Sequence, residues 1–232
     1  MVLDIHGVLY PLILIFAFLT AILGIFLLNA LFGNKIKELF SDTKYFIFFF
    51  LICGYSIYAL GELTWYLIFT VFEEIPTAGM PDFYWVVGTL LMLSSFFVLS
   101  KTLYKEYGQN KLPSLLLGGA LLLILVIGMV VVFETSNFLG YFYPIIGSLI
   151  VILSTNLILF YNQLETFETN LVYLFFSNIG FLVAELIYTY TTSQEIYGLW
   201  GAFADFLYLL SYALSALAFL ILLIRFYSTS KK

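Results

Sequence analysis

Four acidic residues lie within or at the start of long apolar stretches of this sequence. Glu62, Glu185 and Asp205 are embedded in apolar runs, and Asp82 stands at the beginning of another. A charged carboxylate at bilayer depth is costly, and such groups normally face the interior of a helix bundle. No Lys, Arg or His stands at a matching depth in the sequence. Each carboxyl is therefore expected to be protonated, hydrogen-bonded to Tyr, Ser, Thr or Asn, or bound to a cation.

Each of these residues also has a structural interpretation. Asp82 follows a proline and could cap the free N–H groups of a helix start, where a carboxylate suits the helix dipole. Asp205 follows two glycines and could do the same if its helix begins late. Glu62 and Glu185 have no capping position, so they are either hydrogen-bonding groups that hold helices together or residues of a site. For Glu62 and Glu185 we favour a role in a ligand-binding site.

Aromatic residues accompany the acidic ones. Trp65 and Tyr188 follow the two glutamates by three positions, one helical turn away, and could wall the same cavity. Trp65, Trp85 and Trp200 also suit the belt of aromatic residues expected at a membrane surface, and this interpretation is preferred for Trp200. No catalytic residue is predicted, and the presence of a metal ion is left open. The expected ligand-binding set is Glu62, Glu185, Asp205, Asp82, Trp65, Tyr188, Tyr84 and Tyr208.

The composition indicates a chain that lies in lipid. Of 232 residues, 63% are hydrophobic and 10% charged, with a mean hydropathy of +1.07. Soluble domains carry about 25% charged residues, and a membrane helix needs about 20 apolar residues. The apolar runs are continuous and too long for barrel strands. We therefore predict an all-α membrane protein with seven transmembrane helices, at about 8–32, 44–72, 82–101, 112–133, 139–161, 169–191 and 199–225.

The basic residues predict the orientation of these helices. All nine Lys and Arg follow the first, third and seventh runs, and the alternate connections carry none. Basic residues that flank membrane spans stay in the cytoplasm. We expect a multi-pass protein of the cell membrane with its N-terminus outside and its C-terminus in the cytoplasm. The nine residues are Lys35, Lys37, Lys44, Lys101, Lys105, Lys111, Arg225, Lys231 and Lys232.

The first and last thirds of the chain look like copies of each other. A shift of 123 residues places 61–65 on 184–188, with both glutamates aligned, and places Asp82 on Asp205. A shift of 133 places Tyr10-Pro11 on Tyr143-Pro144. One membrane domain is therefore predicted. It contains repeat one (about 8–101), a connecting helix (about 112–133) and repeat two (about 139–225), and the single connecting helix makes the repeats parallel in the membrane.

Several cofactor and enzyme classes are excluded by missing residues. The single cysteine, Cys53, and the single histidine, His6, allow neither an intrachain disulfide nor a His/Cys zinc site. No lysine lies between Gly198 and Ile224, so no retinal Schiff base is expected, and no cofactor is predicted. No GxSxG, HExxH or phosphate-binding glycine loop is present. A non-catalytic protein is favoured over an enzyme.

Short acidic and aromatic motifs end one helix and begin the next. The sequence reads G-E-L-T-W-Y over residues 61–66 and D-F-Y over 82–84, and A-D-F-L-Y over 204–208 repeats the second motif. These segments resemble the multi-helix membrane sensory regions of some prokaryotic diguanylate cyclases and histidine kinases. The resemblance covers about a third of the chain and implies a sensor, although this chain carries no catalytic output domain. A signal would have to pass to a separate partner.

Three functions follow, in decreasing order of support. The first is a receptor-like or sensory protein with an acidic and aromatic pocket that opens outward to a small ligand, a cation or a lipid. The second is a small SWEET-like or proton-coupled transporter, because the 3+1+3 layout resembles the SWEET, PQ-loop and KDEL-receptor group, although no Pro is followed by Gln. The third is a carboxylate-based lipid hydrolase. Membrane lipids and a cytoplasmic or membrane signalling partner are expected, and nucleic acid is not.

Overall fold

The protein is a bundle of helices. The computed structural model describes residues 5–33, 39–68, 79–108, 112–134, 138–164, 168–196 and 198–229, and these contain no strand. Seven spans in them are long and apolar enough to cross a membrane. The helices are α1 (Ile5–Phe32), α2 (Thr43–Leu67), α3 (Met80–Tyr107), α4 (Leu112–Val132), α5 (Phe138–Ser154), α6 (Asn156–Leu159), α7 (Val172–Ser193) and α8 (Gly198–Thr229), with short 3-10 turns at Tyr161–Gln163 and Glu168–Leu171.

The predicted all-α fold with seven apolar spans is confirmed. Within the described residues the sixth run begins with the 3-10 turn before α7, and the fifth run is interrupted. It is divided at Thr155 into α5 and the one-turn α6. The side chains of Ser154 and Thr155 both donate to the carbonyl of Val151, at 3.1 and 2.8 Å, and the Asn156 amide donates to Leu153. Such side-chain bonds compete with the backbone ladder and bend helices. Three such residues in succession account for the break.

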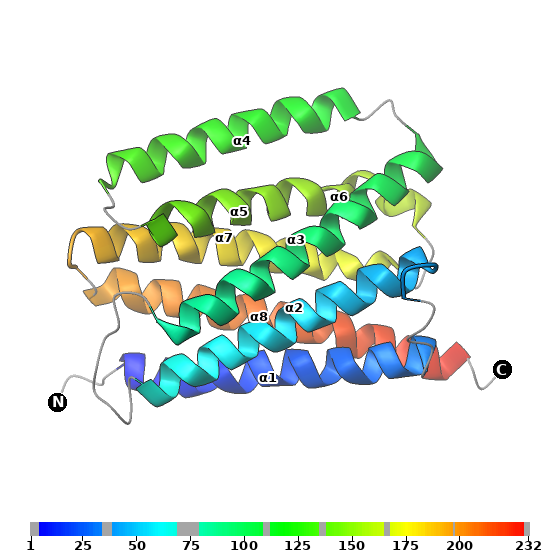
Figure 1. Ribbon diagram of the computed structural model, residues 1–232, viewed down its shortest axis with the longest axis horizontal. Coiled ribbons are helices and arrows are strands. Elements are labelled where there is room, and N and C mark those ends of the chain that lie inside the picture. Colours follow the sequence, from blue (N-terminus) through cyan, green and yellow to red (C-terminus); the bar gives the residue numbers. More distant parts are fainter. Residues whose placement is uncertain are drawn as a thin grey trace.

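Six of the spans form a closed ring. Neighbours pack in the order α1, α2, α3, α5, α7 and α8, and α8 returns to α1. α4 stands outside the ring and packs mainly on α5, and Figure 1 shows it along one edge of the bundle. α1 begins at one end of the bundle and α8 finishes at the other, as an odd number of spans requires (Figure 1). Exchanging the two predicted repeats would leave this order unchanged, and the repeat itself stays a prediction.

Two glycines allow a close contact between α2 and α3. A Cβ atom added at Gly54 of α2 would lie 2.9 Å from the carbonyl oxygen of Gly88 in α3, and one added at Gly88 would lie 2.8 Å from that of Gly54. Both distances are too short for a real side chain. The two backbones therefore touch, as small residues permit in membrane bundles.

Hydrogen bonds from small polar side chains join neighbouring helices. Three of them have a buried hydroxyl as the donor and a backbone carbonyl of the next helix in the ring as the acceptor. Such bonds replace the hydrophobic drive that lipid cannot supply between apolar helices. They run from Thr20 to Tyr212 (α1 to α8, 3.0 Å), from Ser95 to Ile47 (α3 to α2, 2.8 Å) and from Ser177 to Ser211 (α7 to α8, 2.8 Å).

Charge is divided between the two ends of the bundle. The four Lys and Arg residues in the described ranges lie where α2 begins and where α3 and α8 finish. We call the opposite end, where α2 and α7 finish and α3 and α8 begin, the acidic end. Which end faces the cytoplasm stays a prediction from the sequence. The other five basic residues, with Asp4, Glu73 and Glu74 of the predicted outer segments, lie outside the described residues.

Candidate functional site

The four acidic candidates come together at the acidic end. Glu62 lies in the second-last turn of α2, Glu185 lies in α7, Asp82 lies in the first turn of α3, and Asp205 lies in the third turn of α8. Glu185 and Asp205 both act electrostatically on Glu62, and Asp82 acts on Glu185. Glu62 is 6% exposed and Asp205 3%. Residues from both ends of the sequence therefore form one acidic cluster.

Asp82 has the capping role that was one of its two interpretations. It is the third residue of α3, and its Oδ2 accepts a hydrogen bond of 2.9 Å from the backbone N–H of Gly79, the N-cap. The Tyr143 hydroxyl of α5 approaches Oδ1 at 3.4 Å. Asp82 thus fixes the start of α3 and faces the cluster as well.

The capping interpretation of Asp205 is wrong. α8 begins at Gly198, seven residues earlier, so Asp205 lies in the third turn of the helix, where the backbone N–H groups already have helical partners. The two glycines before it do not delay the helix. Asp205 is buried without capping the helix. It acts electrostatically on Glu62 and so belongs to the acidic cluster.

Glu62 is held by a tyrosine from the far end of the chain. The Tyr212 hydroxyl of α8 donates to Glu62 Oε1 at 2.8 Å. This is the optimal length for an O–H···O bond, and Tyr212 is 0% exposed. The indole of Trp85 also lies in the surroundings of Glu62. Glu62 is thus bonded inside the protein.

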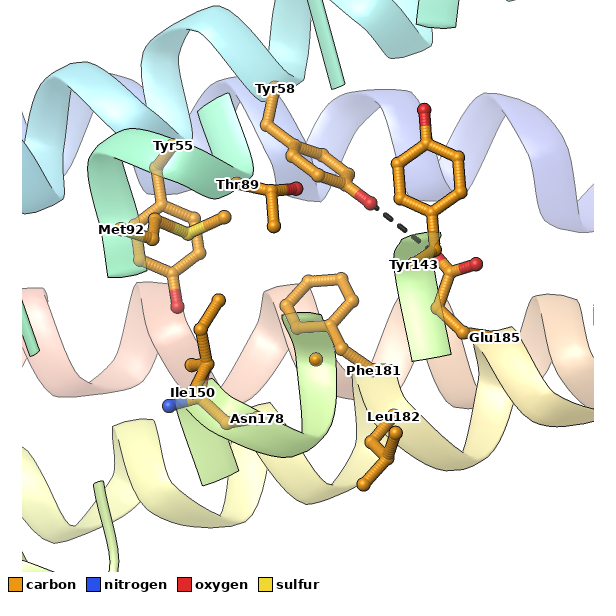
Figure 2. A pocket seen from close by; sticks show the side chains of 11 residues that line it. Tyr55, Tyr58, Thr89, Met92, Tyr143, Ile150, Asn178, Phe181, Leu182 and Glu185 are labelled. Atoms are coloured by element: carbon orange, nitrogen blue, oxygen red, sulfur yellow. Dashed lines mark hydrogen bonds between the residues drawn. The ribbon is translucent and has the colours of Figure 1, made fainter. Parts of the chain in front are cut away.

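Glu185 faces a small cavity. The cavity measures about 40 Å³ and lies between α2, α3, α5 and α7, and Figure 2 shows the side chains around it. Tyr58 of α2 points toward Glu185, with its hydroxyl 3.4 Å from Oε1, which is longer than a normal O–H···O bond. Tyr208 of α8 also interacts with this carboxylate. The cavity is lined by Tyr55, Tyr58, Thr89, Met92, Tyr143, Gly147, Ile150, Asn178, Phe181, Leu182 and Glu185.

One amide nitrogen in the cavity wall has no hydrogen-bond partner. Asn178 of α7 is 4% exposed, and its amide nitrogen is buried without a hydrogen-bond acceptor. Buried polar groups are nearly always bonded, so an unpaired donor calls for an explanation. A cavity with a carboxylate acceptor and an unpaired amide donor is a place for a small polar guest.

The other predicted residues lie around the cluster without lining the cavity. Trp65 packs against Trp85, with ring centroids 6.0 Å apart, and the Trp65 indole N–H is buried without an acceptor. Tyr188 lies within electrostatic range of three of the acidic residues. Tyr84 contacts the exposed Phe83 of its own helix. Of the eight predicted site residues, Glu185 is the one in the cavity wall.

Sequence reasoning missed several residues of this site, and part of the signal was present. Tyr58 and Phe181 stand four residues before the two glutamates and so share their helix faces. Their rings lie 6.0 Å apart across the bundle. Tyr212 stands seven residues after Asp205, on the same face of α8. Nothing local marks Asn178.

A second cavity has no charged side chain in its lining. It measures about 380 Å³ and lies on the outer side of α3 and α5, where its lining includes the exposed Phe97 and one serine, Ser94. In a membrane such a surface faces lipid chains.

The groups at the acidic end have chemistry that suits the binding of a ligand. Glu185 can accept hydrogen bonds or balance a positive charge, and the hydroxyl and amide groups around it can orient a guest. Among the described residues, no three His, Cys, Asp or Glu side chains are grouped closely enough to hold a metal ion. Comparisons of this chain with protein-family models, with curated proteins and with solved structures find no match.

Proposed function

We propose that this protein is a receptor-like or sensory membrane protein that binds a small monovalent cation of the ammonium class at Glu185. The observation that carries the proposal is the cavity of about 40 Å³ that Glu185 shares with aromatic rings and an unpaired amide. Charge, ring chemistry and size each narrow the choice of guest.

The charge of the site favours a cation. At the acidic end Glu185 and Asp205 act electrostatically on Glu62, and Asp82 acts on Glu185. The sequence has no Lys, Arg or His between residues 45 and 100 or between 112 and 224. Like charges held close together at low dielectric repel strongly unless a proton or a cation intervenes. The absence of a three-ligand metal group among the described residues favours a monovalent guest over Ca²⁺ or Zn²⁺, which need several such ligands.

The aromatic rings favour an ammonium group in particular. Tyr58, Tyr143 and Phe181 line the same cavity as Glu185. Aromatic rings attract cations through the negative face of their π system, and aromatic cages recognise alkylammonium ligands. An ammonium N–H could also donate to the Glu185 carboxylate, and a water beside it could accept from the Asn178 amide.

The size of the cavity limits the guest. A water needs about 10–15 Å³, so about three waters fit in this space. Sites for drug-sized ligands span about 300–1,000 Å³. An ammonium ion is about as large as a water, and methylammonium occupies about two such places. Lipid headgroups and sugars would require the helices to separate.

Sensing, in this proposal, works through the packing of the helices. A guest at Glu185 contacts residues of α2, α3, α5 and α7 together, so its binding stabilises one arrangement of the ring. The resemblance to membrane sensory regions supports this reading, and the output passes to a separate partner at the basic end. The N-terminus, and with it the acidic end, lies outside the cell.

The test is a thermal unfolding series on the purified full chain in detergent. Ammonium and methylammonium chloride are compared with sodium chloride at equal ionic strength, for wild type, Glu185→Gln and the control Glu106→Gln, an exposed acid at the other end. A ligand at about 100 times its Kd should raise the midpoint of wild type and control by roughly 5–10 °C. Glu185→Gln should not respond. An equal response of Glu185→Gln, or none from wild type, contradicts the proposal.

A small transporter is the second candidate. The packing of α1 on α8 and of α3 on α5 is the pair of contacts that two exchangeable repeats would make, and rocking about such interfaces moves a solute in transporters built from repeats. Flux separates the two functions. A transporter carries labelled methylammonium into sealed vesicles, whereas a sensor binds it without flux.

A further inference from the structure

The two glutamates of the predicted repeats have different surroundings across the ring. A shift of 123 residues places Glu62 on Glu185 and Thr89 on Tyr212. The contact between Glu62 of α2 and Tyr212 of α8 therefore has Glu185 of α7 and Thr89 of α3 as its counterpart positions. Both pairs cross from one repeat to the other.

Only the first of these pairs is bonded. Tyr212 donates to Glu62 at 2.8 Å and fills the space beside it. Thr89 is too short to do the same, and its hydroxyl instead donates to the Trp85 carbonyl of its own helix at 2.7 Å. Thr89 and Glu185 lie on the wall of the same cavity. The cavity thus occupies the place that a tyrosine ring fills in the other half.

A second pair of equivalent positions shows the same difference. The same shift places Tyr55 on Asn178 and Met92 on Ser215. We call the half that contains Glu62 and Tyr212 the closed half, and the half that contains Glu185 and the cavity the open half. In the closed half, Ser215 donates to the Tyr55 hydroxyl at 2.8 Å. In the open half, Met92 offers only a thioether, and the Asn178 amide is left without an acceptor. The counterparts of both hydrogen bonds are missing in the half that holds the cavity, where Glu185 is approached instead by the Tyr58 hydroxyl at 3.4 Å and by Tyr208.

We propose that the bundle carries one cation site and not two, because Tyr212 occupies the site at Glu62 as a built-in substitute for the ligand, while Thr89 keeps the site at Glu185 open. This inference rests on the proposed function and adds to it the stoichiometry and the residue that controls access. Residue 89 sets the size of the guest, and Glu62 is a structural partner of Tyr212.

The binding arm of the test uses isothermal titration of the full chain with methylammonium chloride. Wild type should bind one equivalent, and Thr89→Tyr should bind none because its ring covers Glu185. Tyr212→Thr should open the second half and raise the stoichiometry toward two. Two equivalents in wild type, or full binding by folded Thr89→Tyr, would overturn the inference.

A ligand-free arm separates failure of this inference from failure of the proposed function. Thr89→Leu adds apolar volume to the cavity. The control, Thr20→Leu, adds the same volume at a fully buried threonine that donates to the Tyr212 carbonyl. Thr20 lines neither of the two cavities described in this part of the chain. Thr89→Leu should keep or raise the thermal midpoint, and Thr20→Leu should lower it. If wild type binds no methylammonium and Thr89→Leu still has a higher thermal midpoint than Thr20→Leu, the proposed cation binding is wrong. The inference that the half at Glu185 is open is then still supported. Equal losses in both variants overturn the inference.

Discussion

Replacing Tyr212 with phenylalanine tests how the buried carboxyl of Glu62 is stabilised. The change removes one hydroxyl and leaves the ring, which packs against Phe181 with centroids 4.9 Å apart. Losing the partner of a buried polar group costs about 1–3 kcal/mol in soluble proteins. Hydrogen bonds between membrane helices average about 0.6 kcal/mol and reach about 1.7. Because the bond is 2.8 Å long and both residues are buried, we expect a loss of about 1–2 kcal/mol.

The matched control is Tyr58→Phe. Its hydroxyl stands 3.4 Å from Glu185, so its removal should cost less than about 0.5 kcal/mol. A double-mutant cycle with Glu62→Met isolates the bond, because the double variant leaves neither partner orphaned and should recover most of the loss. The assay is reversible unfolding in mixed micelles by titration with dodecyl sulfate. Additive losses in the cycle, or a larger loss for Tyr58→Phe than for Tyr212→Phe, refute the reasoning.

Three further predictions concern the fold and its orientation. Gly54→Ala should destabilise the bundle by about 1–3 kcal/mol, because its Cβ meets the backbone of α3, whereas Gly118→Ala on α4, with nothing within 4 Å, should be neutral in the same unfolding titration. Asp82→Ala should cost about 1 kcal/mol through the lost cap of α3, and Asp82→Asn should restore most of it; a loss shared equally by both variants contradicts the capping role. For the orientation, single cysteines are introduced at Glu134 or at Lys105 after the native cysteine is changed to serine. The cysteine at 134 should react with an impermeant maleimide added outside the cell, and the one at 105 with the same reagent on the cytoplasmic side. The reverse pattern refutes the predicted orientation.

Much of the fold could be predicted because membrane helices are continuous apolar runs. The predicted run 112–133 and α4 differ by a single residue at one end, and the run 199–225 lies within α8. The break at Thr155 was not predicted. The break depends on side chains that donate hydrogen bonds to the backbone of their own helix. Ser94 and Thr102 make the same kind of bond and do not interrupt α3. Composition alone does not separate these cases.

The candidate site was predictable in part, and the limit has a physical cause. The cost of burying a carboxyl in lipid singles out Glu62 and Glu185 from the sequence alone. The short bond to Glu62 depends on Tyr212, and the space beside Glu185 depends on Thr89; both residues belong to other helices. Helix periodicity gives the face on which a residue lies and gives no information about the partner across the ring.

The long separation between Glu62 and its partner also has a consequence for biosynthesis. The two residues are 150 positions apart, and the donor lies in the last helix. At about 5–20 residues per second, the ribosome completes Tyr212 roughly 8–30 s after Glu62. During that interval α2 sits in the membrane with its carboxyl unmatched, at a cost below the roughly 2.5–3.5 kcal/mol of a charged residue at the centre of a span, because Glu62 lies near the end of the helix. The aromatic and apolar residues of α2 must therefore hold it in the bilayer unaided until α8 arrives, so a chain that stops short of α8 would leave this carboxyl exposed to quality control.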